Sequence, residues 1–298
     1  CIRDRNKMKA LEKMIDPTRK KKELPPIDGD FYDVYHELPP ELRVIQQKVR
    51  EVMETKIQPL VNDYWLRDEF PFEIIPIFQE LNICGVTYEG YGCPNLPFLM
   101  EGVIAHEMAR IDASIATFFG VQSGLVMGSI YLCGSDEQKN KWLPELQQLK
   151  KIGAFGLTEP EVGSGAAGGL TTTCEKTENG WLLNGEKKWI GNAPFADVFI
   201  IWARDIADDQ VKGFLVEKDN PGISVEKIKG KMALRIVQNG QITLNNCLVP
   251  DTDKLEKANT FKDTANVLRM TRAGVAWMAT GCARGAYENA LDLSLIHI

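Results

Sequence analysis

The hydrophobic pattern of this 298-residue chain changes its period twice, and this limits the folds open to it. Over residues 40–151, apolar residues recur at three- and four-residue steps, as from Leu42 to Ile57, which is typical of helices with one buried face. Over residues 152–255, short β-rich runs alternate with turn signals such as Asn179-Gly180. Helical spacing returns over residues 256–298. This order predicts an α+β protein with an antiparallel β domain, since a parallel sheet would need alternating strands and helices.

The same boundaries predict the domain organisation. Residues 1–39 are charged and then proline-rich, which predicts a flexible lead-in. Residues 40–151 form an N-terminal helical domain and residues 152–255 a middle β domain. Residues 256–298 are the start of a C-terminal helical-bundle domain. Because the chain begins at Cys1 and stops inside a helical pattern, we expect it to be an incomplete reading of a longer coding sequence.

Local capping signals refine the N-terminal helical domain. The spacing predicts a helix from Leu99 to Arg110, and Asp112 is placed to cap the apolar helix that follows. Ser135 and Gln138 have the spacing of a capping box, which predicts that another helix begins there.

Composition excludes several functions. The formal net charge of -6 argues against a general nucleic-acid binder, because the phosphate backbone is bound by basic surfaces. The seven cysteines form no C-x-x-C pair and the three histidines lie apart from them, so no metal site is predicted. The longest apolar run, residues 111–133, is interrupted by polar residues, and no membrane span is expected.

A glycine-rich stretch, Gly163 to Gly168, matches the pattern G-x-G-x-x-G. In a Rossmann fold this pattern follows a strand and opens a helix that holds a pyrophosphate. Here the residues that follow, Thr171 to Cys174, favour a strand. A Rossmann dinucleotide site is therefore disfavoured.

Two segments carry a family resemblance. The first, from Phe155 to Ser164, contains T-E-P-E-V-G-S, and the second, from Asn184 to Asn192, reads N-G-E-K-K-W-I-G-N. In this order, between two helical regions, they resemble the acyl-CoA dehydrogenase and acyl-CoA oxidase superfamily. The resemblance covers about residues 35–290 and looks closest to plant-type peroxisomal short-chain acyl-CoA oxidases, with similarity also to glutaryl-CoA dehydrogenase.

The resemblance implies FAD as the cofactor, held by the middle domain. Thr158 would offer its hydroxyl and backbone N–H to the flavin edge, Ser164 would bind the pyrophosphate or nearby CoA phosphates, and Trp189 would lie against the isoalloxazine. An ordinary sheet-core tryptophan is the alternative for Trp189. The full set of implied cofactor residues is Phe155, Gly156, Leu157, Thr158, Ser164, Trp189, Ile190 and Gly191.

An acyl-CoA substrate is implied in the same way, with Ser164, Leu268 and Arg272 as binding residues. A guanidinium suits the phosphates of CoA, although a solvated helix arginine is the alternative for Arg272. Ala116 stands where glutaryl-CoA dehydrogenase carries an arginine for the distal carboxylate. A dicarboxylyl-CoA is thus disfavoured, since a buried carboxylate without a partner is costly.

The resemblance implies desaturation of a short-chain acyl-CoA to a trans-2-enoyl-CoA. Gly191 replaces the Thr or Ser of many dehydrogenases, which is expected to open space beside the flavin and favours an oxidase that uses O₂. The alternatives are a dehydrogenase that passes electrons to electron-transfer flavoprotein, or a non-catalytic FAD- and CoA-binding module. The catalytic glutamate is expected beyond residue 298, because Thr271, at the place that a minority of members use, cannot act as a base near neutral pH.

Assembly and location are also implied only by the resemblance. The full-length protein is expected to be a homodimer or homotetramer. A peroxisomal location is expected for an oxidase, and the mitochondrial matrix is the alternative.

Overall fold

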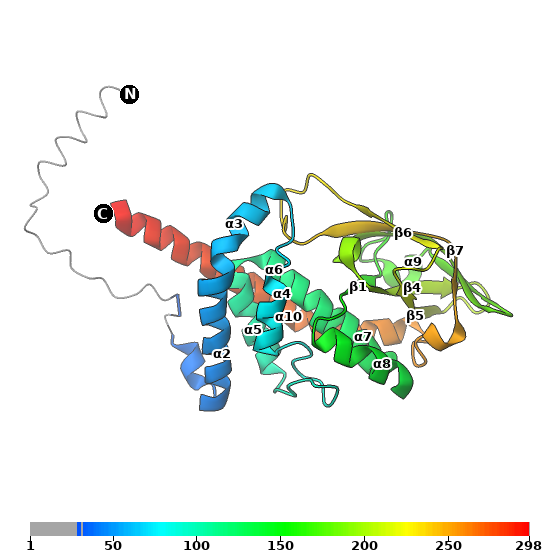
Figure 1. The fold of residues 1–298 in the computed structure, drawn as a ribbon, viewed down its shortest axis with the longest axis horizontal. Coiled ribbons are helices and arrows are strands. Elements are labelled where there is room, and N and C mark those ends of the chain that lie inside the picture. Colours follow the sequence, from blue (N-terminus) through cyan, green and yellow to red (C-terminus); the bar gives the residue numbers. More distant parts are fainter. Residues whose placement is uncertain (1–28, 31, 298) are drawn as a thin grey trace, which may run out of the picture.

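The computed structural model describes residues 29–30 and 32–297, with a helical region beside a β-sheet (Figure 1). The helical region comprises the 3-10 helix η1 (Val34–Glu37), α2 (Pro40–Val52), the π-helix η2 (Met53–Ile57), α3 (Gln58–Arg67), α4 (Ile74–Leu81), α5 (Leu99–Ile111), α6 (Ala113–Phe119), the π-helix η3 (Gly120–Val126), α7 (Met127–Cys133) and α8 (Asp136–Gln147). The last helix, α10 (Phe261–His297), begins near the sheet and runs past these helices.

The predicted capping residues begin the helices as expected. The Asp112 carboxylate accepts hydrogen bonds from the N–H groups of Ser114 and Ile115, at 2.7 and 3.1 Å, so that α5 ends and α6 begins at this residue. Ser135 and Gln138 form the reciprocal capping box at the start of α8. These predictions are confirmed, because capping depends on residues only three or four positions apart.

The central helix differs from its prediction in one respect. Within the described residues, the stretch Ala113–Cys133 is long and apolar enough to cross a membrane by length and composition alone, although its polar residues led us to expect no such segment. Two thirds of its most apolar window, 67%, is buried inside the protein, as expected for a core helix. Its middle part, η3, is a π-helix, a local irregularity that is frequent at functional sites.

The sheet is mixed, not purely antiparallel as predicted. The β region holds β1 (Gly153–Gly156), α9 (Ala166–Gly169), β2 (Thr173–Thr177), β3 (Gly180–Gly191), the 3-10 helix η4 (Ala193–Phe195), β4 (Val198–Asp205), β5 (Val211–Glu217), β6 (Ile223–Lys227), β7 (Asn239–Val249) and the 3-10 helix η5 (Asp251–Asp253). The strand order is β1-β4-β2-β3-β7-β6, and β5 pairs with β4. Both β1 and β2 run parallel to β4, while the other pairs are antiparallel.

The parallel pairs have a simple origin. One edge of β4 pairs first with β1, where Gly153 faces Val198, and then with β2, where Thr173 faces Arg204. The chain therefore leaves this edge after β1 and returns to it as β2 in the same direction. The intervening residues 157–172 leave the sheet in the middle of an edge, and they contain the T-E-P motif.

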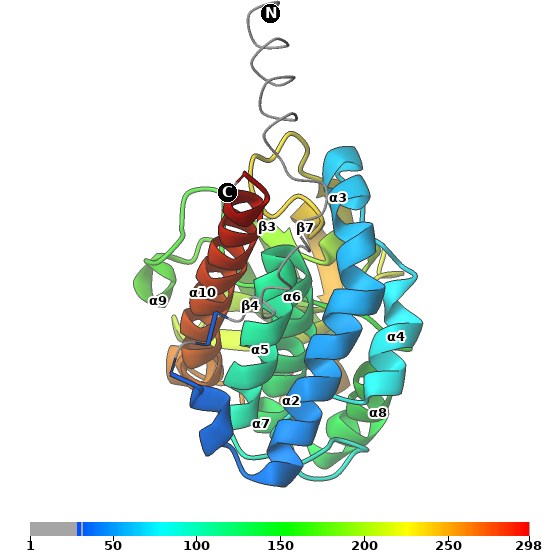
Figure 2. The same cartoon turned by 90° about the vertical axis from the view of Figure 1, so that its left-hand side faces the viewer.

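The long helix α10 lies directly on α5, and Figure 2 shows α10, α5 and α2 side by side. The contact uses Gly281 and Gly285, which are four residues apart and share one face of α10. A Cβ at Gly281 would overlap the carbonyl oxygen of His106, and a Cβ at Gly285 would overlap that of Arg110. The two helix backbones therefore touch, which only glycine permits here.

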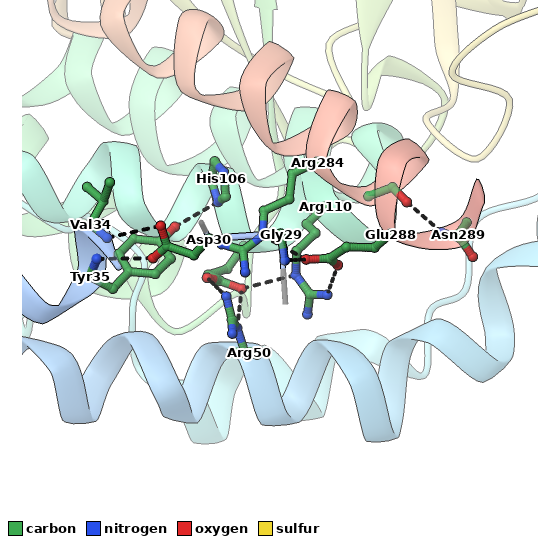
Figure 3. Close-up of polar contacts among 12 residues, drawn as sticks. Gly29, Asp30, Val34, Tyr35, Arg50, His106, Arg110, Arg284, Glu288 and Asn289 are labelled. Atoms are coloured by element: carbon green, nitrogen blue, oxygen red, sulfur yellow. Dashed lines mark hydrogen bonds and ion pairs between the residues drawn. The ribbon is translucent and has the colours of Figure 1, made fainter. Parts of the chain in front are cut away.

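Charged residues reinforce this contact (Figure 3). The buried carboxylate of Glu107 accepts hydrogen bonds from Gln46, Arg50 and Arg110 at 2.8 to 3.3 Å. Arg110 also pairs with Glu54, and at 2.8 Å with Glu288 of α10. The network joins α2, η2, α5 and α10 through α5.

The end of the predicted lead-in is held against these helices. The N–H of Gly29 donates to Glu288 Oε1 at 3.0 Å, and the Tyr35 hydroxyl hydrogen-bonds to His106 Nδ1 at 2.7 Å, as drawn in Figure 3. This part of the stretch is anchored rather than flexible, because it satisfies polar groups of α5 and α10. Residues 1–28 of the predicted lead-in lie outside the described residues.

The glycine contact between α5 and α10 leads to a stability prediction. The substitution Gly285→Ala should lower the free energy of unfolding by about 1–3 kcal/mol, because the added methyl forces the two backbones apart. Gly274→Ala is the matched control in the same helix, where a Cβ meets nothing within 4 Å. It should stabilise by about 0.5–1 kcal/mol through helix propensity. Urea unfolding measures both, and equal effects of the two substitutions would show that the close contact is absent.

Candidate functional site

A buried ion pair joins the two motif segments. The Lys187 ammonium lies 2.8 Å from Glu159 Oε1, and the two side chains are 0% and 1% exposed. Glu159 also accepts from the backbone N–H and hydroxyl of Thr171 and from the N–H of Thr172, at 2.6 to 2.9 Å. Lys187 donates further to the carbonyl of Leu157 at 3.2 Å. Residues 157–172 form an excursion from the sheet between β1 and β2, and the pair therefore fixes both ends of this excursion to β3.

The pKa values follow from this arrangement. Burial by itself raises the pKa of Glu159, but the charge and hydrogen bonds of Lys187 and Thr171 outweigh it and bring the pKa to about 2. Burial lowers the pKa of Lys187 to about 8 against the attraction of Glu159. The carboxylate is thus ionised throughout the neutral range and holds its donors in place.

Thr158 and Trp189 lie next to each other at the base of this excursion. The Thr158 hydroxyl donates to the carbonyl of Lys188 at 2.7 Å, and the Lys188 N–H donates to the Thr158 carbonyl at 2.9 Å. Trp189 has a positive φ of 64° and sits where the β3–β7 register shifts between Lys187 and Ile190. This bulge turns the indole outward, and it is 56% exposed. The alternative in which Trp189 is a sheet-core residue is wrong.

The other motif residues divide into buried and exposed groups. Phe155, Gly156, Leu157 and Ile190 are buried, and Phe155 contacts Trp202 with the ring centroids 6.1 Å apart. These residues therefore offer only backbone atoms to a ligand. Ser164 is exposed on the loop before α9, which is a helix of four residues. The strand predicted after the glycine-rich stretch is β2, which begins at Thr173.

A cavity of about 450 Å³ lies between α5, α6, η3 and α10. Its wall is mostly apolar and includes Ala116 and Thr271. It is lined by Glu101, Ala105, Ala113, Ala116, Thr117, Phe119, Gly120, Val121, Ser123, Gly124, Leu125, Leu234, Thr271, Gly274, Val275, Met278, Ala279 and Cys282. A space of this size is in the range of small-molecule sites.

The cavity meets the sheet at Gly191. The Val121 Cγ2 methyl of the cavity wall lies 3.3 Å from the place that a Cβ at residue 191 would take. A side chain at residue 191 would therefore press against Val121 on one side. The expectation that Gly191 opens room beside the flavin stays a prediction.

Two polar side chains of η3 attach the cavity wall to its surroundings, one to the sheet and one to the loop after α4. The buried amide of Gln122 donates to the carbonyls of Leu146 and Lys151 at 2.9 Å, and its oxygen accepts from the Gly153 N–H at 2.8 Å. Ser123 Oγ accepts from the Gly85 N–H at 2.8 Å. The position of η3 relative to β1 is thus set by hydrogen bonds to backbone groups that would otherwise be buried without partners.

Glu101 is the acidic residue of the cavity wall, and no sequence motif marks it. Burial raises the pKa of this carboxyl to about 7. The one available signal is that Glu101 is a charged residue among apolar neighbours, namely Leu99, Met100 and Val103. Glu159 and Lys187 have no local signal as a pair, because 28 residues separate them.

The predicted substrate residues occupy one stretch of α10. Leu268 is partly buried against the helical core, and Arg272 is exposed. The Thr271 hydroxyl between them donates to the Leu268 carbonyl at 3.1 Å. The structure thus brings Thr271 to the cavity, packs Leu268 against the helical core and leaves Arg272 at the surface.

Comparison with known proteins gives matches over both regions. Residues 39–150 match the family model "Acyl-CoA dehydrogenase, N-terminal domain", and residues 154–247 match "Acyl-CoA dehydrogenase, middle domain". An acyl-CoA dehydrogenase of Bacillus subtilis is 32% identical over 254 residues, which are 84% of this chain and 67% of that protein.

Two further matches extend the comparison. The rat "Short-chain specific acyl-CoA dehydrogenase, mitochondrial" is 29% identical over 260 residues, which are 86% of this chain and 63% of that protein. A crystal structure of a glutaryl-CoA dehydrogenase from Mycobacterium smegmatis in complex with FADH2 aligns with a TM-score of 0.84 and 35% identity, over 88% of this chain and 67% of that one. The chain spans about two thirds of the length of these relatives.

The ion pair can be tested by removing its cation. Lys187→Met leaves Glu159 buried without its counter-ion, so the free energy of unfolding should fall by about 3–5 kcal/mol. Lys188→Met changes the neighbouring, partly exposed lysine and should alter it by no more than about 0.5 kcal/mol. Urea unfolding of both variants gives the comparison. Equal losses would mean that the pair does not hold the excursion to β3.

Glu101 should give stability a distinct pH dependence. Its pKa in the folded chain is about 7 and its ordinary value is 4.5, so the folded state holds the proton more tightly between these values. The free energy of unfolding should therefore fall as the pH rises from 4.5 to 7, by at most about 1.4 kcal/mol per pH unit for this one group. Burial and the nearby charge of Glu101 raise the pKa of the Tyr88 hydroxyl, so Tyr88 does not ionise in this window.

The measurement is urea unfolding of the wild type and of Glu101→Gln at a series of pH values. The variant should gain stability relative to the wild type as the pH rises toward 7. Glu80→Gln, which changes an exposed acid on α4, should track the wild type. A constant difference between Glu101→Gln and the wild type would contradict the raised pKa.

Proposed function

Because this chain belongs to the acyl-CoA dehydrogenase family, as its motifs predicted, we propose that it desaturates a short-chain acyl-CoA to the trans-2-enoyl-CoA with FAD as its cofactor. The observation that carries this proposal is the apolar cavity that meets the motif-bearing strand at Val121 and Gly191. An acyl chain in the cavity lies within reach of a flavin held against that strand. The relatives with acyl-CoA dehydrogenase names support the same chemistry.

The chain's own residues fit a flavin. The outward indole of Trp189 offers a flat apolar surface, and the adjacent Thr158 offers an oxygen and a backbone N–H at its edge. A Cβ at Gly163, Gly165 or Gly168 would meet nothing within 4 Å, so this loop leaves room for a large ligand. A bound FAD would supply the hydride acceptor for the β-carbon of the substrate.

Substrate binding is assigned to the cavity and to α10. The apolar wall would hold the acyl chain and exclude water, and the exposed Arg272 would meet the phosphates of CoA together with Ser164. Thr271 lines the cavity, but its hydroxyl donates to the Leu268 carbonyl, so it takes no proton from the substrate. The general base remains predicted as a glutamate beyond residue 298.

We assign the electron acceptor as electron-transfer flavoprotein rather than O₂. The argument for an oxidase depended on open space at Gly191, and the Val121 methyl lies against one side of that space. The relatives from Bacillus subtilis and rat are dehydrogenases by name, and the rat relative is mitochondrial by name. The mitochondrial matrix is therefore the proposed location in place of the peroxisome, and a homodimer or homotetramer the proposed assembly.

The proposal is tested with FAD and the longer, full-length protein, which would include the glutamate expected beyond residue 298. Bound flavin should give a yellow protein, and butyryl-CoA should perturb the flavin spectrum. With a dehydrogenase, butyryl-CoA should reduce an artificial electron-accepting dye and give only traces of peroxide in air. Stoichiometric peroxide would establish the oxidase, and flavin binding without any turnover would favour the non-catalytic binding module. A colourless protein that binds no FAD would contradict the proposal altogether.

A further inference from the structure

We propose that Glu101 is a specificity determinant of the acyl cavity and selects acyl groups that carry a hydroxyl over plain alkyl chains and over chains that end in a carboxylate. This inference rests on the proposed function, because it takes the cavity as the place of the acyl group. It adds a substrate class to that function. The argument depends on where Glu101 lies, on what surrounds it and on the chemistry of its carboxyl group.

Glu101 lies where α5, η3 and α10 converge. Its Oε1 is 3.5 Å from the place of a Cβ at Gly124, and the Thr271 methyl is 3.1 Å from the same place. Gly124 follows Val121 by three residues, so the two share one face of η3. Val121 is the cavity residue that meets Gly191. The carboxyl group therefore lies about one helical turn from the point where the cavity meets the sheet.

Glu101 is partly buried, and it differs from the buried acids Glu107 and Glu159 in its contacts. Within the described residues, no hydrogen bond or ion pair reaches its carboxyl group, whereas Glu107 has Gln46 and two arginines, and Glu159 has Lys187 and two threonines. A ligand that fills the cavity would displace water from this partly buried carboxyl group, and a carboxyl group that loses water without gaining a partner costs free energy. A ligand that supplies its own hydrogen bond avoids this cost.

The carboxyl group suits a hydroxyl in either protonation state. Burial raises its pKa to about 7, so both the acid and the carboxylate are present near neutral pH. The acid donates a hydrogen bond and the carboxylate accepts one, and a hydroxyl group can do either. A methyl group would leave the carboxyl unpaired. A ligand carboxylate would meet a like charge, and Ala116 offers no cation to offset it.

The test compares three probes by isothermal titration calorimetry on the FAD-loaded chain: butyryl-CoA, 4-hydroxybutyryl-CoA and glutaryl-CoA. The wild type should bind the hydroxylated probe roughly tenfold more tightly than butyryl-CoA, and glutaryl-CoA most weakly. Glu101→Leu should lose the preference for the hydroxyl group. Glu101→Gln should keep most of it, because an amide also donates and accepts. Both variants should bind glutaryl-CoA more tightly than the wild type does.

The controls separate this inference from the proposed function. Glu178→Leu, an exposed acid in the turn between β2 and β3, should leave all three affinities unchanged. Cooperative urea unfolding of each variant verifies that it is folded. Equal binding of butyryl-CoA and 4-hydroxybutyryl-CoA by the wild type, or a preference that survives in Glu101→Leu, would overturn the role of Glu101 and leave the proposed function intact. If the wild type binds none of the three, the proposed function fails and this inference with it.

Discussion

The buried pair of Glu159 and Lys187 is the interaction on which the flavin side of the molecule depends. It closes an excursion of the chain that leaves the sheet after β1 and returns as β2 on the same edge of β4. Without the pair, Thr158 would lose its fixed place beside Lys188, and the loop that carries Ser164 would lose its attachment at Thr171 and Thr172. Removing both charges of so buried an ion pair from water costs free energy. The hydrogen bonds that the pair makes with backbone groups offset part of this cost and fix the position of the excursion.

The helix α5 plays the corresponding part on the substrate side. Its backbone touches Gly281 and Gly285 of α10, its Glu107 gathers arginines from two helices, and its Glu101 faces the cavity. One helix thus holds a fully paired acid at a structural junction and, in the cavity wall, an acid to which no described residue gives a hydrogen bond. The contrast between these two carboxyl groups is the reason for assigning them different roles.

Much of the architecture is predictable from sequence, because its signals are local. Asp112 and the Ser135–Gln138 pair begin their helices through contacts of a few residues, and the order of helical and β regions follows from periodicity. The parallel pairing of β1 and β2 with β4 is not predictable in this way, because strand direction depends on where the chain returns to the sheet. The outward turn of Trp189 likewise depends on a bulge between two paired strands.

The sequence by itself determined the family, the cofactor class and the motifs that carry them, because these are patterns of residue types along the chain. Only the tertiary structure decided what the charged and small residues do. It joined Glu159 to Lys187, placed Val121 against Gly191, and set Glu101 as the acidic residue in a mostly apolar wall. The physical reason is that the free energy of a charge or a gap depends on what lies across from it in space, and those neighbours come from distant parts of the chain.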